Sequence, residues 1–210
     1  MPKQELILSI DIEANGPSPI TNSMLSFAVA AFTLDKHLIG TFSRNLEERP
    51  GTSPDPGTVV WWNRSHENRE AYAATRKDLV SPEQSVVDLR TWANEFKEFH
   101  RLAAAAYPAS YDAMWVQSYV CAFLKDEKGD IDNLLGISWL DLKSYVNGAF
   151  FPESEFRSVS KKMMPREWFD ELPHTHVAED DAIEQGCTII NVIRKRRGLP
   201  PIKGFQDDRR

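Results

Sequence analysis

Three short segments of the sequence carry side chains that can bind metal ions or move protons. The first is Asp11-Ile12-Glu13, at the end of an apolar run that is typical of a β-strand. Alternate residues of a strand point to the same face, so we expect Asp11 and Glu13 to lie together, opposite Ile10 and Ile12. Adjacent carboxylates repel each other, and a hard divalent cation would relieve that repulsion. A solvated acidic face on an edge strand is the alternative interpretation.

The other two segments place acids and histidines near helix starts. Asp112 follows a short Ala-rich strand and begins a helix, and ligands of α/β sheets gather at such strand ends. An aspartate there can equally be an ordinary helix cap. In the third segment, His174 and His176 precede Glu179-Asp180-Asp181, whose charges can also simply complement a helix dipole. The spacing nevertheless allows Asp181 to hold a metal while His176 reaches the same place.

A sheet with helices packed on it would position these segments. The predicted strands are short apolar runs bounded by turn residues: 5–12, 24–33, 38–46, 102–107 and 137–142. The predicted helices show apolar residues at steps of three and four or lie in long apolar stretches: 82–100, 112–125 and 181–197. The segment 49–58, rich in proline and glycine, is expected to be a surface loop. This order predicts an α/β protein in which an antiparallel meander is followed by parallel strands.

Length and composition limit the class of protein. The 210 residues, 41% hydrophobic and 27% charged, predict one soluble globular domain with a core over about 5–197 and a short tail, 198–210. Cys121 and Cys187 lie in apolar stretches and are expected to be buried and unpaired, which fits a reducing cytoplasm. We find no secretory signal or membrane-spanning run. The net charge of −6 argues against a broad basic surface that coats nucleic acid.

The order and spacing of the three segments resemble those of the DEDDh 3′-5′ exonucleases, the family of proofreading exonuclease subunits, oligoribonuclease and ribonuclease T. The resemblance covers roughly residues 5–195 and implies a ribonuclease H-like fold. It also implies four metal-binding acids and a general base, which fall on Asp11, Glu13, Asp112, Asp181 and His176. Asp180, adjacent to Asp181, and Asp141, on a predicted strand, are rival carboxylates that the register ranks lower.

Finer features resemble a subgroup of prokaryotic and phage exonucleases, whose members act on RNA or on DNA. They are Thr58-Val59-Val60-Trp61-Trp62, Asp141-Leu142-Lys143-Ser144-Tyr145 and Met164-Pro165. Many family members carry His-Asn where this chain has Tyr107-Pro108. That departure leaves the assignment of Asp112 intact but weakens any substrate preference inferred from the family.

Several residues are candidates for gripping the substrate. One of Trp61 and Trp62 is expected to be in the core and one to stack on a terminal base. Met24 and Leu25 are candidates for an apolar wedge against that base. A basic cluster leading towards His176 can contact phosphates or can be a solvated loop: Arg157, Lys161, Lys162 and Arg166.

The sequence therefore predicts a 3′-5′ exonuclease that hydrolyses single-stranded nucleic acid from a free 3′ end, with RNA favoured over DNA only by resemblance to the subgroup. Two divalent cations, Mg²⁺ or Mn²⁺, would lower the pKa of the attacking water and neutralise phosphate charge. His176 would take the water's proton. The alternatives are a catalytically silent nucleic-acid-binding module on the same fold and an endonuclease. Relatives are often dimers, so a homodimer is also an expectation. Four of the 31 acids are the proposed ligands, which accounts for most of the acidic excess.

Overall fold

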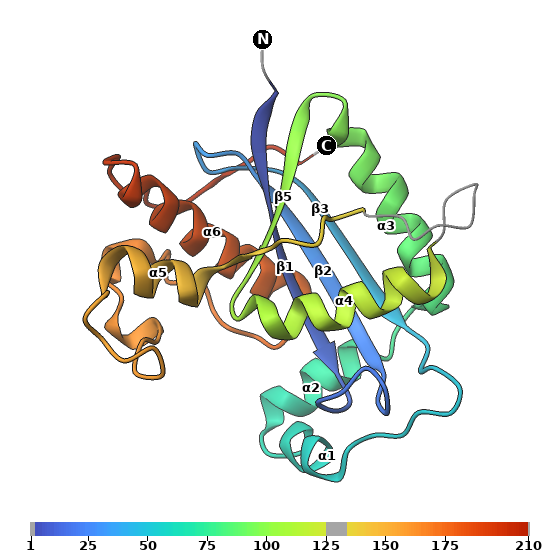
Figure 1. Ribbon diagram of the computed structural model, residues 1–210. Helices are drawn as coiled ribbons and strands as arrows, with labels where there is room; N and C mark the ends of the chain where they lie inside the picture. Colours follow the sequence, from blue (N-terminus) through green and yellow to red (C-terminus); the bar gives the residue numbers. More distant parts are fainter. Residues whose placement is uncertain (1–2, 125–133, 210) are drawn as a thin grey trace.

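One mixed β-sheet forms the centre of the computed structural model, which describes residues 3–124 and 134–209 (Figure 1). Three long strands pair in antiparallel order: β1 (Gln4–Ala14), β2 (Met24–Phe32) and β3 (His37–Leu46). Strand β5 (His100–Ala106) then pairs with β1 in parallel. The shorter strands β4 (Leu79–Val80) and β6 (Leu140–Asp141) complete the order β4-β3-β2-β1-β5-β6. The predicted antiparallel meander and mixed sheet are confirmed.

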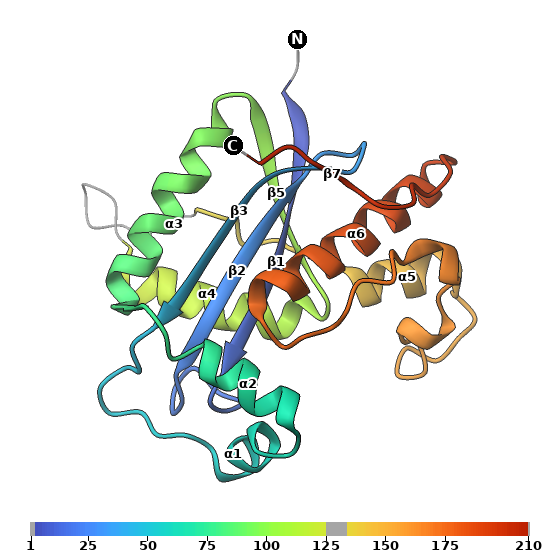
Figure 2. The ribbon, with the colours of Figure 1, turned by 180° about the vertical axis from the view of Figure 1, so that it is seen from behind.

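Helices cover both faces of the sheet. In Figures 1 and 2, α3 (Pro82–Lys97) and α4 (Ala109–Phe123) lie on one face, and α5 (Leu142–Phe150) and α6 (Ala178–Arg196) on the other. Alternate side chains of β1 divide between the two layers, as the period of a strand requires. Leu6, Leu8, Ile10 and Ile12 join the core under α3 and α4. Ile7 joins the core under α6, so the odd-numbered face of β1 carries Asp11 and Glu13 towards that helix.

Helix α6 approaches the sheet closely because of a glycine. A Cβ atom at Gly186 would lie 2.5 Å from a ring carbon of Phe32 and 3.0 Å from Cβ of Ser9. Beside it, Gln185 Nε2 donates to the carbonyl of Ile10 at 2.9 Å and to Oγ of Ser9 at 3.2 Å. These contacts fix the first turns of α6 against the carboxyl-terminal half of β1.

The segment predicted as a loop is partly helical. Residues 49–55 are a loop, but α1 (Pro56–Trp62) begins at Pro56, and α2 (His66–Ala74) follows it. Asp55 caps α1, its Oδ2 accepting from the backbone N–H of Thr58 at 2.8 Å, and proline suits the first helical position because its missing N–H would have no partner. Neither helix was predicted. Both lie beyond the carboxyl end of β1 (Figure 1).

Three other predictions need correction or qualification. The strand predicted over 137–142 is only Leu140–Asp141, and Asp141 instead caps α5 through a 2.7 Å bond from the N–H of Ser144. Cys187 is buried as expected, whereas Cys121 is exposed on α4. Helix α4 ends at Phe123, and residue 125, the predicted end, lies outside the described residues.

The remaining elements lie in the second half of the chain. Two 3₁₀ turns precede α6: η1 (Lys161–Met163) and η2 (Arg166–Trp168). The predicted tail contributes β7 (Gln206–Asp207), which pairs in parallel with the start of β3. Among the described helices, none combines the length and apolar character of a membrane span.

Candidate active site

Carboxylates from three separate elements converge at the carboxyl end of β1. Oxygen atoms of Asp11, Glu13 and Asp181 all lie within 4.8 Å of one another. Asp181 lies in the first turn of α6 and is buried. Asp112, in the first turn of α4, is also buried, and its negative charge acts on both Asp11 and Glu13. The structure therefore brings together the four acids that the sequence singled out, which we call the acidic cluster.

The acidic cluster buries more negative charge than its surroundings compensate. Burial raises the pKa of Asp11 and of Glu13 well above the ordinary values, and repulsion from the other acids adds to the effect. Burial also raises the pKa of Asp112 to about 7, although backbone hydrogen bonds oppose the rise. The nearby Lys161 ammonium lowers the pKa of Asp11 but does not cancel the increase. Bound cations would offset the repulsion between these buried carboxylates.

The loop before α6 holds the Asp181 carboxylate in place. Oδ1 accepts from the backbone N–H of Thr175 at 2.9 Å, and Oδ2 accepts from the backbone N–H of His176 at 3.0 Å. Nδ1 of His174 lies 3.1 Å from Oδ1. The rival Asp180 is exposed and instead accepts from the Thr175 hydroxyl at 2.9 Å. Of the two adjacent aspartates, Asp181 is therefore the one that reaches the cluster.

Two histidine rings lie beside Asp181 in different electrostatic states. Burial lowers the pKa of His176, and the neighbouring His174 lowers it further, so His176 is neutral at pH 7. The hydrogen bond to Asp181 raises the pKa of His174. The ring centroids of the two histidines are 4.5 Å apart, and that of His176 is 4.9 Å from that of Trp61. His174 was absent from the predicted site, since its contact with Asp181 forms only in the folded loop.

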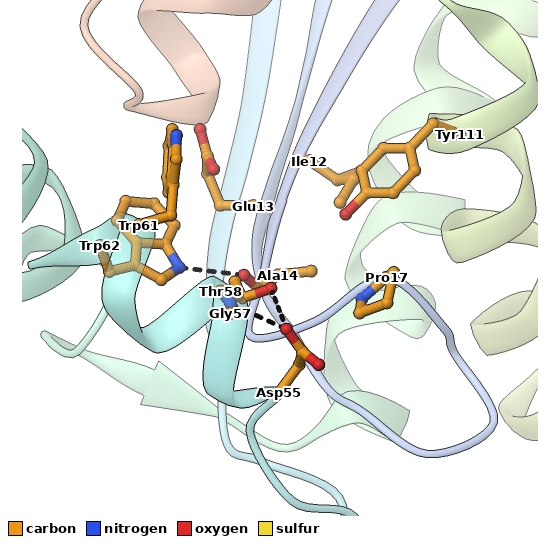
Figure 3. Close-up of a pocket in the computed structure, with 10 residues that line it drawn as sticks. All are labelled: Ile12, Glu13, Ala14, Pro17, Asp55, Gly57, Thr58, Trp61, Trp62 and Tyr111. Carbon is orange, nitrogen blue, oxygen red and sulfur yellow. Dashed lines mark hydrogen bonds between the residues drawn. The ribbon is translucent and has the colours of Figure 1, made fainter. Parts of the chain in front are cut away.

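A cleft of about 430 Å³ opens next to the acidic cluster. Figure 3 shows Glu13 and Trp61 close together on one wall and Tyr111 on the opposite wall, with its hydroxyl pointing into the cleft. Trp62 is only 3% exposed, and its Nε1 donates to the carbonyl of Ala14 at 3.1 Å, which ties α1 to β1. Tyr111 was not predicted, and the only signal was its place next to Asp112.

Solved structures with this architecture exist, whereas no family model and no curated protein matches the sequence. The nuclease domain of 3′hExo, described as a DEDDh family member bound to rAMP, aligns over 96% of both chains with a TM-score of 0.58 and 11% identity. A full-length 3′-exonuclease aligns over 94% of this chain and 83% of its own, with a TM-score of 0.56 and 12% identity.

A third comparison is with exonuclease I from E. coli, in a metal-free complex with single-stranded DNA. It aligns over 93% of this chain with a TM-score of 0.59 and 14% identity. The chain has the fold of the DEDDh exonucleases. The chain covers only 41% of exonuclease I, so the likeness concerns the nuclease fold rather than that whole enzyme.

Within this DEDDh fold, the predicted wedge residues are not accessible. Met24 and Leu25 are completely buried, Met24 in the core under α4 and Leu25 against Trp62. Side chains enclosed on every side offer no surface to a terminal base, so the structure does not support the wedge.

Of the four residues in the predicted basic cluster, Lys161 faces the acidic cluster, whereas Arg157, Lys162 and Arg166 are exposed. Lys161 Nζ donates to Glu184 Oε2 at 2.7 Å, and its charge acts on Asp11, so it lies beside the acidic cluster. Asp141, the other rival carboxylate, is engaged elsewhere in the DEDDh fold, because its Oδ2 accepts from the N–H of Ala109 at the start of α4 at 2.8 Å.

Proposed function

We propose that this protein is a metal-dependent 3′-5′ exonuclease that removes nucleotides from the free 3′ end of single-stranded nucleic acid. One observation carries the proposal: four acids with insufficient counter-charge converge next to a neutral histidine at the end of β1. Relatives in fold are described as bound to rAMP or to single-stranded DNA, which supports a nucleic-acid substrate. RNA is favoured over DNA only by the subgroup resemblance. The homodimer and the cytoplasmic location stay predictions.

The acidic cluster fits two divalent cations, Mg²⁺ or Mn²⁺. All its donors are carboxylate oxygens, which these hard ions prefer, and burial, with mutual repulsion at Asp11 and Glu13, raises the pKa values of Asp11, Glu13 and Asp112. Together with Asp181, these residues would hold the ions. When bound, the ions would neutralise charge on the scissile phosphate and lower the pKa of the attacking water.

The protein's own groups supply the proton acceptor and the grip on the substrate. His176, neutral at pH 7, would accept the water's proton on its unprotonated ring nitrogen. The N–H of the same residue holds Asp181, so the proton acceptor and the metal ligand are positioned by one loop. Trp61 contacts the His176 ring and lines the cleft, where its indole face can stack on the terminal base.

Digestion of end-labelled oligonucleotides tests the proposal. RNA and DNA oligomers, labelled at the 5′ or the 3′ end, are incubated with Mg²⁺, Mn²⁺ or EDTA. We expect 5′-labelled products to shorten stepwise, 3′ label to leave as mononucleotide, and EDTA to stop both. Cleavage of a circular substrate would show an endonuclease. Absence of cleavage on both nucleic acids with both ions would favour the catalytically silent module.

The roles of the loop residues are tested with matched variants. His176→Ala should lower turnover by about 10²–10⁴-fold, because the proton acceptor is lost, while Mn²⁺ binding measured by calorimetry is retained. Asp181→Asn should weaken Mn²⁺ binding itself. A His176→Ala enzyme that digests the oligomer at the wild-type rate would show that His176 is not the base.

A further inference from the structure

A second group of metal-ligating side chains shares one residue with the acidic cluster. Ligand atoms of His174, His176 and Asp181 all lie within 4.8 Å of one another. Two of the three donors are imidazole nitrogens, whereas every donor of the acidic cluster is an oxygen. We call these three residues the histidine triad. Asp181 belongs to both groups, so an ion in the triad and the ions of the acidic cluster share a ligand.

We propose that the histidine triad binds a zinc ion that inhibits the enzyme. The inhibition rests on the proposed nuclease function, whereas zinc binding does not. Imidazole suits Zn²⁺, while Mg²⁺ and Mn²⁺ favour carboxylates, so the two groups of ligands select different ions. Two histidines and one carboxylate form a known ligand set for zinc, with water in the fourth position.

One pair of donors in the triad already has the spacing that zinc requires. Zinc bonds of about 2.0–2.1 Å in a tetrahedral arrangement place neighbouring donors roughly 3.3 Å apart. Nδ1 of His174 lies 3.1 Å from Oδ1 of Asp181, a separation now held by a shared proton that a metal ion would replace. The remaining donor, on His176, lies within 4.8 Å of the other two, and the two imidazole centroids are 4.5 Å apart.

The triad is also pre-organised and accessible. Backbone N–H groups of Thr175 and His176 fix both oxygens of Asp181, and such supporting bonds strengthen metal sites. The side chain of His174 is 56% exposed, which gives an ion a path from solvent. The His176 ring contacts both Trp61 and His174, with centroid distances of 4.9 Å and 4.5 Å.

Zinc in the triad would disable two functions together. The nitrogen lone pair of His176 would be engaged by zinc and unable to accept the water's proton. Asp181 would be withdrawn, wholly or in part, from the acidic cluster. Inhibition should therefore persist in excess Mg²⁺, because Mg²⁺ competes poorly for imidazole nitrogen.

Direct binding tests the site independently of nuclease activity. The Asp11→Asn/Glu13→Gln variant, checked for folding by circular dichroism, leaves the triad as the main site for a transition metal. We expect it to bind one Co²⁺ with a visible absorption band from nitrogen coordination, and Zn²⁺ to displace the Co²⁺. Adding His174→Gln should lower Co²⁺ affinity by at least about tenfold, since even the loss of a supporting contact costs a metal site that much.

The matched control is His66→Gln in the same background. His66 also has a carboxylate partner, with Nδ1 3.2 Å from Glu70 Oε2, but it lies exposed on α2. Co²⁺ binding should be the same with and without this change. Equal Co²⁺ affinity with and without His174 would overturn the proposal, as would a spectrum that lacks the nitrogen-dependent band.

Inhibition is measured on the intact enzyme with a 3′-labelled oligomer, Mg²⁺ in excess and increasing Zn²⁺. His174→Gln should raise the half-inhibitory zinc concentration by at least about tenfold, each variant being normalised to its own rate without zinc. An unchanged value would overturn the inhibitory role. If no variant digests the oligomer under any condition, the nuclease function fails, while the Co²⁺ experiment still decides whether the triad binds metal.

Discussion

The described part of the molecule buries charge in two places and handles it in opposite ways. Lys36, in the turn between β2 and β3, is completely buried, yet its Nζ lies 2.7 Å and 2.8 Å from the two oxygens of Asp170 and donates to the carbonyl of Ile202 at 2.7 Å. The acidic cluster buries carboxylates of one sign, and the pKa values of Asp11, Glu13 and Asp112 are raised in consequence. The first charge is satisfied within the chain, and the second is not.

This difference separates a structural ion pair from the proposed metal-binding site. The pair of Lys36 and Asp170 links the β2–β3 turn to the segment before α6, and the chain itself completes it. Lys161 is the lysine whose charge acts on Asp11 of the acidic cluster, and it is itself paired with Glu184. Charge left uncompensated at the mouth of a cleft is what a cation-dependent enzyme needs, at a cost in stability when cations are absent.

Breaking the internal pair should have the largest effect on stability. Lys36→Met leaves Asp170 buried without its counter-charge and should lower the free energy of unfolding by about 3–5 kcal/mol. The double variant Lys36→Met/Asp170→Leu should recover much of that loss, because neither charge remains buried. Urea denaturation of the three proteins measures both effects. A single variant as stable as the wild type would mean that the pair contributes nothing.

Removing metal should reveal the opposite behaviour in the acidic cluster. The folded-state pKa of Asp112, about 7, lies above its ordinary value of 3.8, so the folded protein binds the extra proton. In EDTA, protonation of Asp112 should stabilise the fold fully below about pH 4. That contribution to the free energy of unfolding, a few kcal/mol, should be lost as the pH rises to about 7. Thermal unfolding in EDTA from pH 5 to 8 should therefore show a falling Tm. Saturating Mn²⁺ should reverse the trend, since cations displace protons.

Neutralising one acid should reduce that pH dependence. Asp112→Asn removes a titrating group and relieves repulsion on Asp11 and Glu13, so in EDTA at pH 8 we expect it to be more stable than the wild type by about 1 kcal/mol or more. The increase in stability on adding Mn²⁺ should be smaller for this variant than for the wild type. Differential scanning calorimetry with and without Mn²⁺ measures both. A variant less stable than the wild type in EDTA would contradict the view that Asp112 is uncompensated.

The smallest effect is expected one residue away from the acidic cluster. Asp180 is exposed and contacts only the Thr175 hydroxyl among the hydrogen bonds found in the described residues. Asp180→Asn should change unfolding free energy by no more than about 0.5 kcal/mol and leave Mn²⁺ affinity unaltered. Calorimetric titration of this variant beside Asp181→Asn measures the difference. Equal loss of Mn²⁺ binding in both variants would show that Asp180 belongs to the acidic cluster as much as Asp181 does.

Local patterns in the sequence were sufficient for the long elements and failed for short ones. The meander was predictable because β1 and β2 are long apolar runs separated by turn residues. Helix α1 was missed because the proline and glycine of its first turn are also typical of a loop, although Asp55 followed by Pro56 is a helix-start signal. Two-residue strands such as β6 carry no periodicity, and neighbouring strands alone determine them.

Which residues can do chemistry was decided by the sequence, because residue type and strand period are local properties. Asp11 and Glu13 share a face of β1 as their spacing requires, and the order of the acids matched a known pattern. The tertiary structure alone decided which groups meet. Only the close packing of α6 brings Asp181 to β1, and only the folded loop joins His174 to it. The first contact joins residues more than 160 positions apart in the chain, which no local pattern records, and the second depends on the folded course of the loop.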